Sequence, residues 1–244
     1  MKILAVAALL LSALPAYALE IQKVTERVYA IVGPLDQRSA DNLANNATFG
    51  LVVTDDGAVL IDTGGSWLGA EELHGAVREI TDQPVRFVIN SGGQDHRWIG
   101  NDYWQQQGAQ VIASDAAVAD HKDRGSLQMT GLSVLLGDKL AGTVPAYADI
   151  TFDTDYSFEL GGVAFEITYA GQAHTPGDSF VWVPSASTVF TGDIVYMERI
   201  LGIGDQSHSG TWIEVFEAVA ALNPTHIVPG HGAPTDLAGA TADT

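Results

Sequence analysis

Short β-rich runs separated by helical patterns recur in both halves of the chain, and this alternation constrains the fold more than any other feature. The stretch Phe49–Asp62 holds two such runs on either side of Asp56 and Gly57, a pair that is typical of a tight hairpin turn. Trp67–Ile80 then carries apolar residues at helical spacing. Strand-like runs return in the second half, with another amphipathic helix before the last of them. The chain is therefore predicted to form an α/β sandwich, as one domain over residues 19–236.

The two ends of the chain differ from this pattern. The first 18 residues have a single cation at Lys2, an apolar run, and Ala16 and Ala18 in an A-x-A arrangement. These features predict a secretory signal peptide over residues 1–18, and its apolar run is shorter than the ~20 residues that span a bilayer. The mature protein is thus expected to be periplasmic or secreted, without membrane insertion after cleavage. The small and polar residues 237–244 are predicted to be a disordered tail.

Composition narrows the possible chemistry and partners. The chain has no cysteine, so an exported form has no disulfide and no thiolate ligand or nucleophile. Its formal net charge is −19, from 11 basic and 30 acidic residues. Such a charge repels nucleic acid phosphates and anionic lipid head groups. We therefore expect a small-molecule substrate and no nucleic acid partner, and the sequence identifies no protein partner.

Histidine and aspartate collect where apolar strands run into turns that contain glycine or proline. Three histidines share this context: His96 in FVINSGGQDH, His174 in ITYAGQAHTPGD and His231 in HIVPGHG. Asp193 does the same in VFTGD, and Asp95 precedes His96 directly. Loops at strand ends often carry function because a rigid sheet holds them in place while they stay accessible.

These residue types predict a metal site. Imidazole nitrogen and carboxylate oxygen both suit a divalent ion, with Zn²⁺ favoured and iron or manganese as alternatives. The other four histidines lack this context. His74 is expected on a helix surface, His121 in a charged run and His226 at the start of a strand, whereas the loop residue His208 could contact a substrate.

At these residues the chain resembles the metallo-β-lactamase superfamily, on its glyoxalase-like side. VVTDDGAVLIDTG is similar to the family's opening hairpin, NSGGQDH to its H-x-H-x-D-H motif, and AGQAHTPGD to its third-histidine loop. FTGD matches the bridging aspartate and VPGHG the last histidine, in the expected order. The resemblance implies an αββα four-layer sandwich of metallo-β-lactamase type, with the metal site along one edge.

The resemblance also shows a departure at the first motif. The family's first two histidines fall on Ser91 and Gly93, or near Gly92 and Gln94 if the turn is one residue shorter. The first metal position thus keeps only His174, which cannot hold a tetrahedral ion by itself.

The second metal position is complete, and it implies one divalent ion bound by Asp95, His96, Asp193 and His231. His174 would be a distant fifth ligand or a hydrogen-bonding group. In a hydrolytic reaction, Asp95 would orient the attacking water and His174 would stabilise or protonate the developing anion.

Three functions are compatible with this site. The first is an exported metal-dependent hydrolase with a mononuclear site, acting on a small-molecule ester, thioester or sulfur-linked substrate. The second is a non-catalytic metal- or ligand-binding module that kept the scaffold. The third is an accessory protein of sulfur-compound or quinoprotein metabolism, because QRSADNLANNATFG and NSGGQDHRWIGN are similar to exported relatives of that kind.

Overall fold

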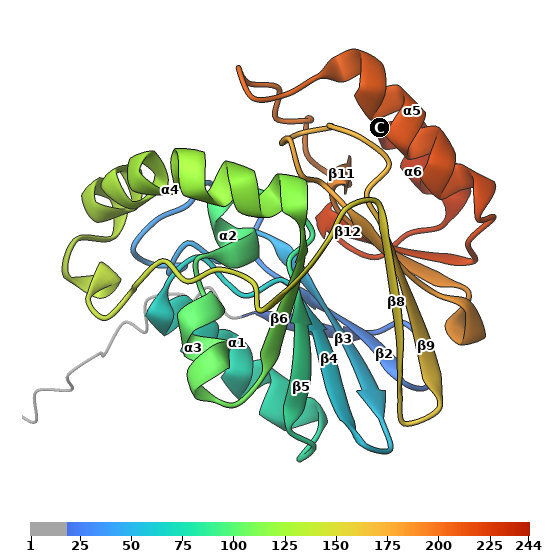
Figure 1. Cartoon of the computed structure of the whole chain (residues 1–244), viewed down its shortest axis with the longest axis horizontal. Helices are drawn as coiled ribbons and strands as arrows, with labels where there is room; N and C mark the ends of the chain where they lie inside the picture. The colour runs from blue at the N-terminus through green and yellow to red at the C-terminus, as the bar shows by residue number, and fades with distance from the viewer. Residues whose placement is uncertain (1–18) are drawn as a thin grey trace, which may run out of the picture.

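The computed structural model describes residues 19–244, so the predicted signal peptide lies outside the described residues. Two β-sheets stand face to face, and helices cover their outer faces (Figure 1). This arrangement confirms the expected αββα sandwich. In the part of the chain that the structure describes, no helix combines the length and the apolar character needed to cross a membrane.

The first sheet has seven strands in sequence order. The first four strands form an antiparallel meander, and the last three add to it in parallel. Thr54 pairs with Gly57, which confirms the predicted hairpin. The strands are β1 Glu20–Lys23, β2 Val28–Val32, β3 Thr48–Thr54, β4 Gly57–Ile61, β5 Val85–Ile89, β6 Gln110–Ser114 and β7 Ile150–Phe152.

The second sheet has five strands in the order β12-β11-β10-β9-β8, antiparallel except for the parallel pair β11 and β12. Its strands are β8 Asp155–Leu160, β9 Val163–Thr168, β10 Phe180–Val183, β11 Thr188–Tyr196 and β12 His226–His231. The helices of the molecule are α1 Trp67–Ile80, α2 Asp95–Trp98, α3 Asn101–Gln106, α4 Asp115–Leu136, α5 Ser209–Ala221 and α6 Leu237–Asp243, with short 3₁₀ turns η1 Gly137–Leu140 and η2 Pro184–Ala186.

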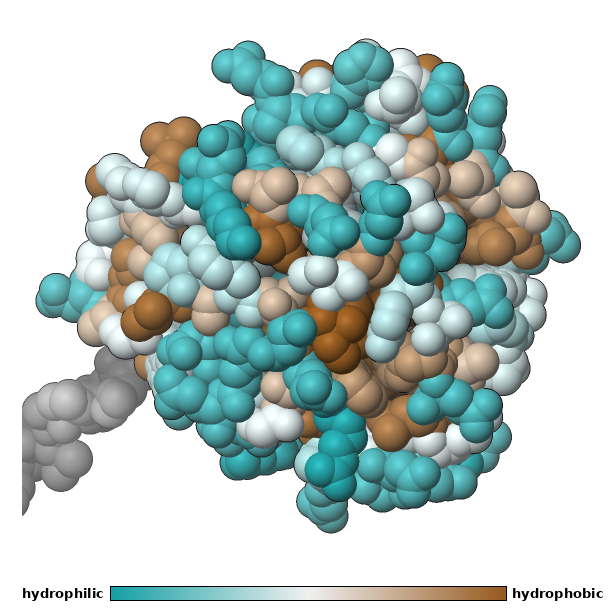
Figure 2. All heavy atoms as spheres, viewed as in Figure 1, coloured by the Kyte–Doolittle hydropathy of each residue, from teal (hydrophilic) through white to brown (hydrophobic). Residues whose placement is uncertain are grey.

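Alternation along the strands builds three apolar layers between the four layers of the fold. In β3, Phe49 and Leu51 pack against α1, whereas Val52 faces the second sheet. The second sheet contributes Phe165 and Phe190 to the layer between the sheets. Its outer face packs against α5 and α6. Because side chains alternate between the two faces of a strand, one sequence pattern supplies both layers. Figure 2 shows the remaining apolar residues as brown patches among hydrophilic ones on the surface.

The helical segment after β5 is interrupted. It begins at Asp95 and is divided into α2 and α3. The division falls at Ile99 and Gly100, where a Cβ on Gly100 would overlap the carbonyl oxygen of Thr63. Helix α4 follows β6 directly and is capped by Ser114, whose side chain accepts from the backbone nitrogen of Ala117.

The structure places residues 237–243 in helix α6, where the sequence predicts a disordered tail. Asp236 caps this helix, since its Oδ1 accepts a hydrogen bond of 2.8 Å from the backbone nitrogen of Gly239. Ala240 is fully buried against the second sheet and α5. Tertiary contact therefore orders a segment that has weak local preferences.

The docking of α6 predicts different effects at two neighbouring alanines. Ala240→Asp would bury an unpaired carboxylate and should lower the free energy of unfolding by about 2–4 kcal/mol. Ala238→Asp is the matched control, because Ala238 is exposed in the first turn, where a negative charge is tolerated. Denaturant unfolding measures both effects. Equal stability of the two variants would contradict the docked helix.

Candidate metal centre

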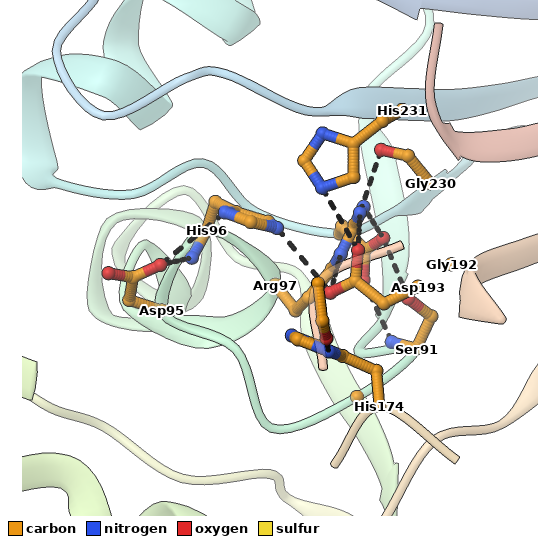
Figure 3. A network of polar contacts seen from close by, with 12 residues as sticks. Ser91, Asp95, His96, Arg97, His174, Gly192, Asp193, Gly230 and His231 are labelled. Atoms are coloured by element: carbon orange, nitrogen blue, oxygen red, sulfur yellow. Dashed lines mark hydrogen bonds and ion pairs between the residues drawn. The ribbon is translucent and has the colours of Figure 1, made fainter. Parts of the chain in front are cut away.

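The candidate site lies where strand ends of both sheets meet. His96 lies in α2, which follows the turn after β5, whereas Asp193 lies within β11 and His231 ends β12. The pairing of β11 with β12 sets Tyr196 beside His231. Figure 3 shows the three side chains approaching one another from these different elements.

His96, Asp193 and His231 form a compact buried group. One ligand atom from each residue lies within 4.8 Å of those of the other two. The Nε2 atom of His231 is 3.1 Å from Asp193 Oδ1, and the Nε2 atom of His96 is 3.5 Å from Asp193 Oδ2. The structure thus brings together three of the five residues that the sequence predicts as ligands.

The imidazoles in this group have unused lone pairs, which fits a bound cation. His231 Nδ1 donates a hydrogen bond to the carbonyl oxygen of Asn46 at 2.7 Å, so in the neutral ring Nε2 has a lone pair facing Asp193. Burial keeps the ring neutral by lowering the pKa of His231 to about 3. Both ring nitrogens of His96 are buried without a hydrogen-bond partner. Lone pairs that converge on a carboxylate require a proton or a metal ion between them, so these residues fit a divalent metal.

Asp95 and His174 lie outside this compact group. Asp95 Oδ1 is 2.8 Å from Arg38 Nε and accepts a 2.9 Å hydrogen bond from the backbone nitrogen of His96. Burial opposes its ionisation, but Arg38 and His96 outweigh that effect and lower the pKa of Asp95 to about 2. His174 Nδ1 donates to the carbonyl oxygen of Gly202 at 2.5 Å. Asp95 is therefore an ionised carboxylate beside the group, and His174 is fixed by the loop after β11.

Arg97 is the residue in this region that the sequence analysis missed. Its side chain is fully buried, and its guanidinium contacts both Asp62 and Asp193. Burial opposes the charge of Asp193, yet Arg97, His231 and His96 hold the pKa of this carboxyl well below its usual value. Arginine is rarely fully buried, so its place in the sequence, between His96 and Trp98, gave no signal of this role.

Other side chains pack closely against the turn that contains Gly92 and Gly93, where the resemblance places the altered motif. A Cβ on Gly92 would overlap the carboxylate of Asp178, and a Cβ on Gly93 would overlap that of Asp120. Arg124 holds Asp120 with a 2.6 Å hydrogen bond and also donates to the Gly93 carbonyl oxygen. The turn is therefore closed, since neither Gly92 nor Gly93 has room for a Cβ.

The remaining histidines have structural roles. His121 is fully buried, stacked on Trp98 with ring centroids 4.4 Å apart, and its Nε2 lies 3.0 Å from the carbonyl oxygen of Gly92. Although His121 lies in a charged run of the sequence, its side chain packs beneath the glycine turn. His74 is half-buried, with Nδ1 2.8 Å from the Tyr103 hydroxyl, rather than free on a helix surface. His208 caps α5, and His226 begins β12 as predicted.

Comparison with known proteins gives one family. A family model described as the metallo-beta-lactamase superfamily matches residues 44–231. A curated metallo-beta-lactamase type 2 from Elizabethkingia meningoseptica is 26% identical over 87% of this chain and 78% of that protein. Another, from Bacteroides fragilis, is 22% identical over 88% of this chain and 79% of that protein.

Solved structures share the fold. A metallo-beta-lactamase from Pontibacter korlensis superposes with a TM-score of 0.73 at 23% identity, covering 91% of this chain and 95% of that one. The DIM-1 metallo-beta-lactamase gives a TM-score of 0.71 at 19% identity, covering 93% and 95%. At these identities the structural matches establish the fold alone.

The closed turn predicts that a single methyl group at residue 93 is destabilising. Gly93→Ala would force apart the Gly93 turn and the Asp120–Arg124 pair, and should lower the free energy of unfolding by about 1–3 kcal/mol. Gly75→Ala is the control, because residue 75 lies on α1 with nothing within 4 Å of a new Cβ. It should stabilise the protein by up to about 1 kcal/mol through helix propensity. Thermal and denaturant unfolding measure both, and a neutral Gly93→Ala would show that the turn has free space.

Proposed function

The chain belongs to the metallo-β-lactamase superfamily, and from this membership we propose an exported metal-dependent hydrolase with a mononuclear site. The proposed substrate is a small-molecule ester, thioester or sulfur-linked compound. The observation that carries the proposal is the convergence of the buried imidazoles of His96 and His231 on Asp193, with both ring nitrogens of His96 lacking a hydrogen-bond partner. Export rests on the signal-peptide pattern of residues 1–18 alone.

His96, Asp193 and His231 are the residues that would hold the metal. Two imidazoles and one carboxylate suit zinc, with iron or manganese as alternatives, and three protein ligands leave a position for substrate or water. A divalent ion there supplies a Lewis acid that polarises a carbonyl group and lowers the pKa of water. We also propose Asp95 as a fourth ligand, because the family motif places an aspartate at this position. Its Oδ2 would bind the metal, since Oδ1 contacts Arg38.

The closed glycine turn supports a single metal rather than two. In the resemblance, Ser91 and Gly93 stand at the positions of the motif histidines. Asp178 fills the space where a Cβ on Gly92 would project, and Asp120 fills that of Gly93. His174 is the one remaining residue of the first metal position. The proposed glyoxalase-like character of the site rests on Asp193, the family's bridging aspartate, and has no separate support from the relatives.

Two neighbouring side chains could handle protons during hydrolysis. Asp95 is ionised across the neutral pH range and can accept a proton from an attacking water. His174 donates through Nδ1 to Gly202, so in the neutral ring Nε2 is an acceptor. Burial also lowers the pKa of His174, which favours that neutral ring. We therefore assign His174 the role of an acceptor or distant ligand rather than a proton donor to the developing anion.

A non-catalytic binding module is the second candidate. The closed turn favours it, because two family ligands have been replaced by a packed structural element. The candidate ligands His96, Asp193 and His231 are also each at most 3% exposed. Such burial suits retention of an ion, whereas catalysis requires an opening for substrate.

Metal content tests the assigned ligands. Protein purified without added metal should contain about one equivalent by elemental analysis, and His231→Ala should reduce this to background. His74→Ala is the matched control, since it removes a half-buried histidine from outside the site. Asp95→Ala decides whether that carboxylate is a ligand. Unchanged metal content in both His96→Ala and His231→Ala would refute the site.

Turnover tests the hydrolase. A panel of esters, thioesters and β-lactams should include at least one substrate, and His96→Ala should reduce its turnover at least ~100-fold, since even outer-shell changes at metal sites cost 10–100-fold. Circular dichroism of the variant confirms that it is folded. Bound metal with no turnover of any class supports the binding module instead.

A further inference from the structure

We propose that Arg97 is a built-in cation that neutralises Asp193, so that the domain folds without metal and binds metal more weakly than the same ligands would without it. This inference rests on the proposed metal site and assigns Arg97 the role of a positioning residue. It concerns how the positive charge of Arg97 offsets the negative charge of the ligand Asp193.

Every donor of the Arg97 guanidinium has an acceptor. Nε donates to Asp193 Oδ2 at 3.2 Å, and Nη2 donates to Asp193 Oδ1 at 2.7 Å, which makes a two-point contact with one carboxylate. Nη2 also donates to the Gly230 carbonyl oxygen at 2.8 Å. Nη1 donates to Asp62 Oδ2 at 2.8 Å and to the Thr48 carbonyl oxygen at 3.2 Å. Since arginine has five N–H donors, its hydrogen-bonding capacity is filled.

These contacts connect the two sheets independently of any ion. Thr48 and Asp62 belong to the first sheet or its strand ends, whereas Asp193 and Gly230 belong to β11 and β12 of the second. Figure 3 shows Arg97 beside Asp193 and Gly230 at the meeting point of these elements. The guanidinium thus holds Asp193 in place from within the protein.

The charge of Arg97 acts mainly on Asp193. Two nitrogens of the Arg97 guanidinium donate to Asp193, whereas Asp62 accepts from one of them and takes two further hydrogen bonds from Ser91. Without Arg97, Asp193 would be a buried carboxylate with only imidazoles beside it. A buried charge that loses its partner is strongly destabilising.

A metal ion would share Asp193 with this guanidinium. Oδ1 lies 3.1 Å from His231 Nε2 and Oδ2 lies 3.5 Å from His96 Nε2, so each oxygen that contacts Arg97 also faces a candidate ligand. Two cations on one carboxylate repel each other, and this repulsion is reciprocal. Arg97 must therefore weaken metal binding, and removing its charge must make stability depend on metal.

Thermal unfolding with and without zinc tests this coupling. In metal-free buffer, Arg97→Gln should lower the Tm by about 10 °C, as expected for a broken buried ion pair in a domain of this size. Zinc should then raise the Tm of Arg97→Gln by more than it raises that of wild type, and chelator competition should show at least ~10-fold tighter zinc binding. A zinc-induced Tm shift in Arg97→Gln that is equal to or smaller than that of wild type would overturn the proposal.

Two further variants separate charge from shape. Arg97→Lys keeps the charge, so its zinc-induced shift should match that of wild type. Asp62→Asn removes a carboxylate partner of Arg97 but leaves Asp193 neutralised, so it should not tighten zinc binding. Tighter zinc binding in Asp62→Asn would contradict the assignment of the charge to Asp193.

A double variant keeps the test decisive if Arg97→Gln does not fold. Asp193→Asn combined with Arg97→Gln removes both charges and should be more stable without metal than Arg97→Gln alone. If the double variant is no more stable, the pairing is not electrostatic and the inference fails. Absence of zinc binding in wild type would instead refute the proposed function, while this metal-free comparison would still decide the role of Arg97.

Discussion

The buried guanidinium of Arg97 is the contact on which the geometry of the site depends. It reaches Asp62 after β4 and Asp193 in β11, and so fixes the first sheet to the second at the edge where the candidate ligands meet. An arginine suits this place because its planar, forked donors can satisfy two carboxylates and two carbonyl groups at once. Because Arg97 fixes the carboxylate of Asp193, the two oxygens of Asp193 face His96 and His231.

Two packed features lie beside the candidate ligands. The turn that contains Gly92 and Gly93 is packed with carboxylates and closed by His121 and Trp98. Arg97 is an internal cation that contacts Asp193. In both features an arginine neutralises a buried carboxylate from within the chain: Arg97 contacts Asp193, and Arg124 contacts Asp120.

Much of the fold could be predicted from residue patterns. Two β-rich runs within Phe49–Asp62 predicted β3 and β4, and Asp56 with Gly57 predicted the hairpin between them. Helical spacing predicted α1 over its full length, Trp67–Ile80. Segments without a strong local pattern could not be predicted from the sequence. Helix α6 depends on burial of Ala240, and the break between α2 and α3 depends on close approach of Gly100 to Thr63.

The sequence by itself determined the fold class, the family and the candidate ligands, because periodicity and short motifs are local properties of the chain. Only the tertiary structure decided which of those ligands meet. It brings His96, Asp193 and His231 together, leaves Asp95 with Arg38, and buries Arg97 and His121. The physical reason is that burial and charge pairing join residues far apart in the chain: Arg97 and Asp193 are separated by 96 positions, and no local pattern records their contact.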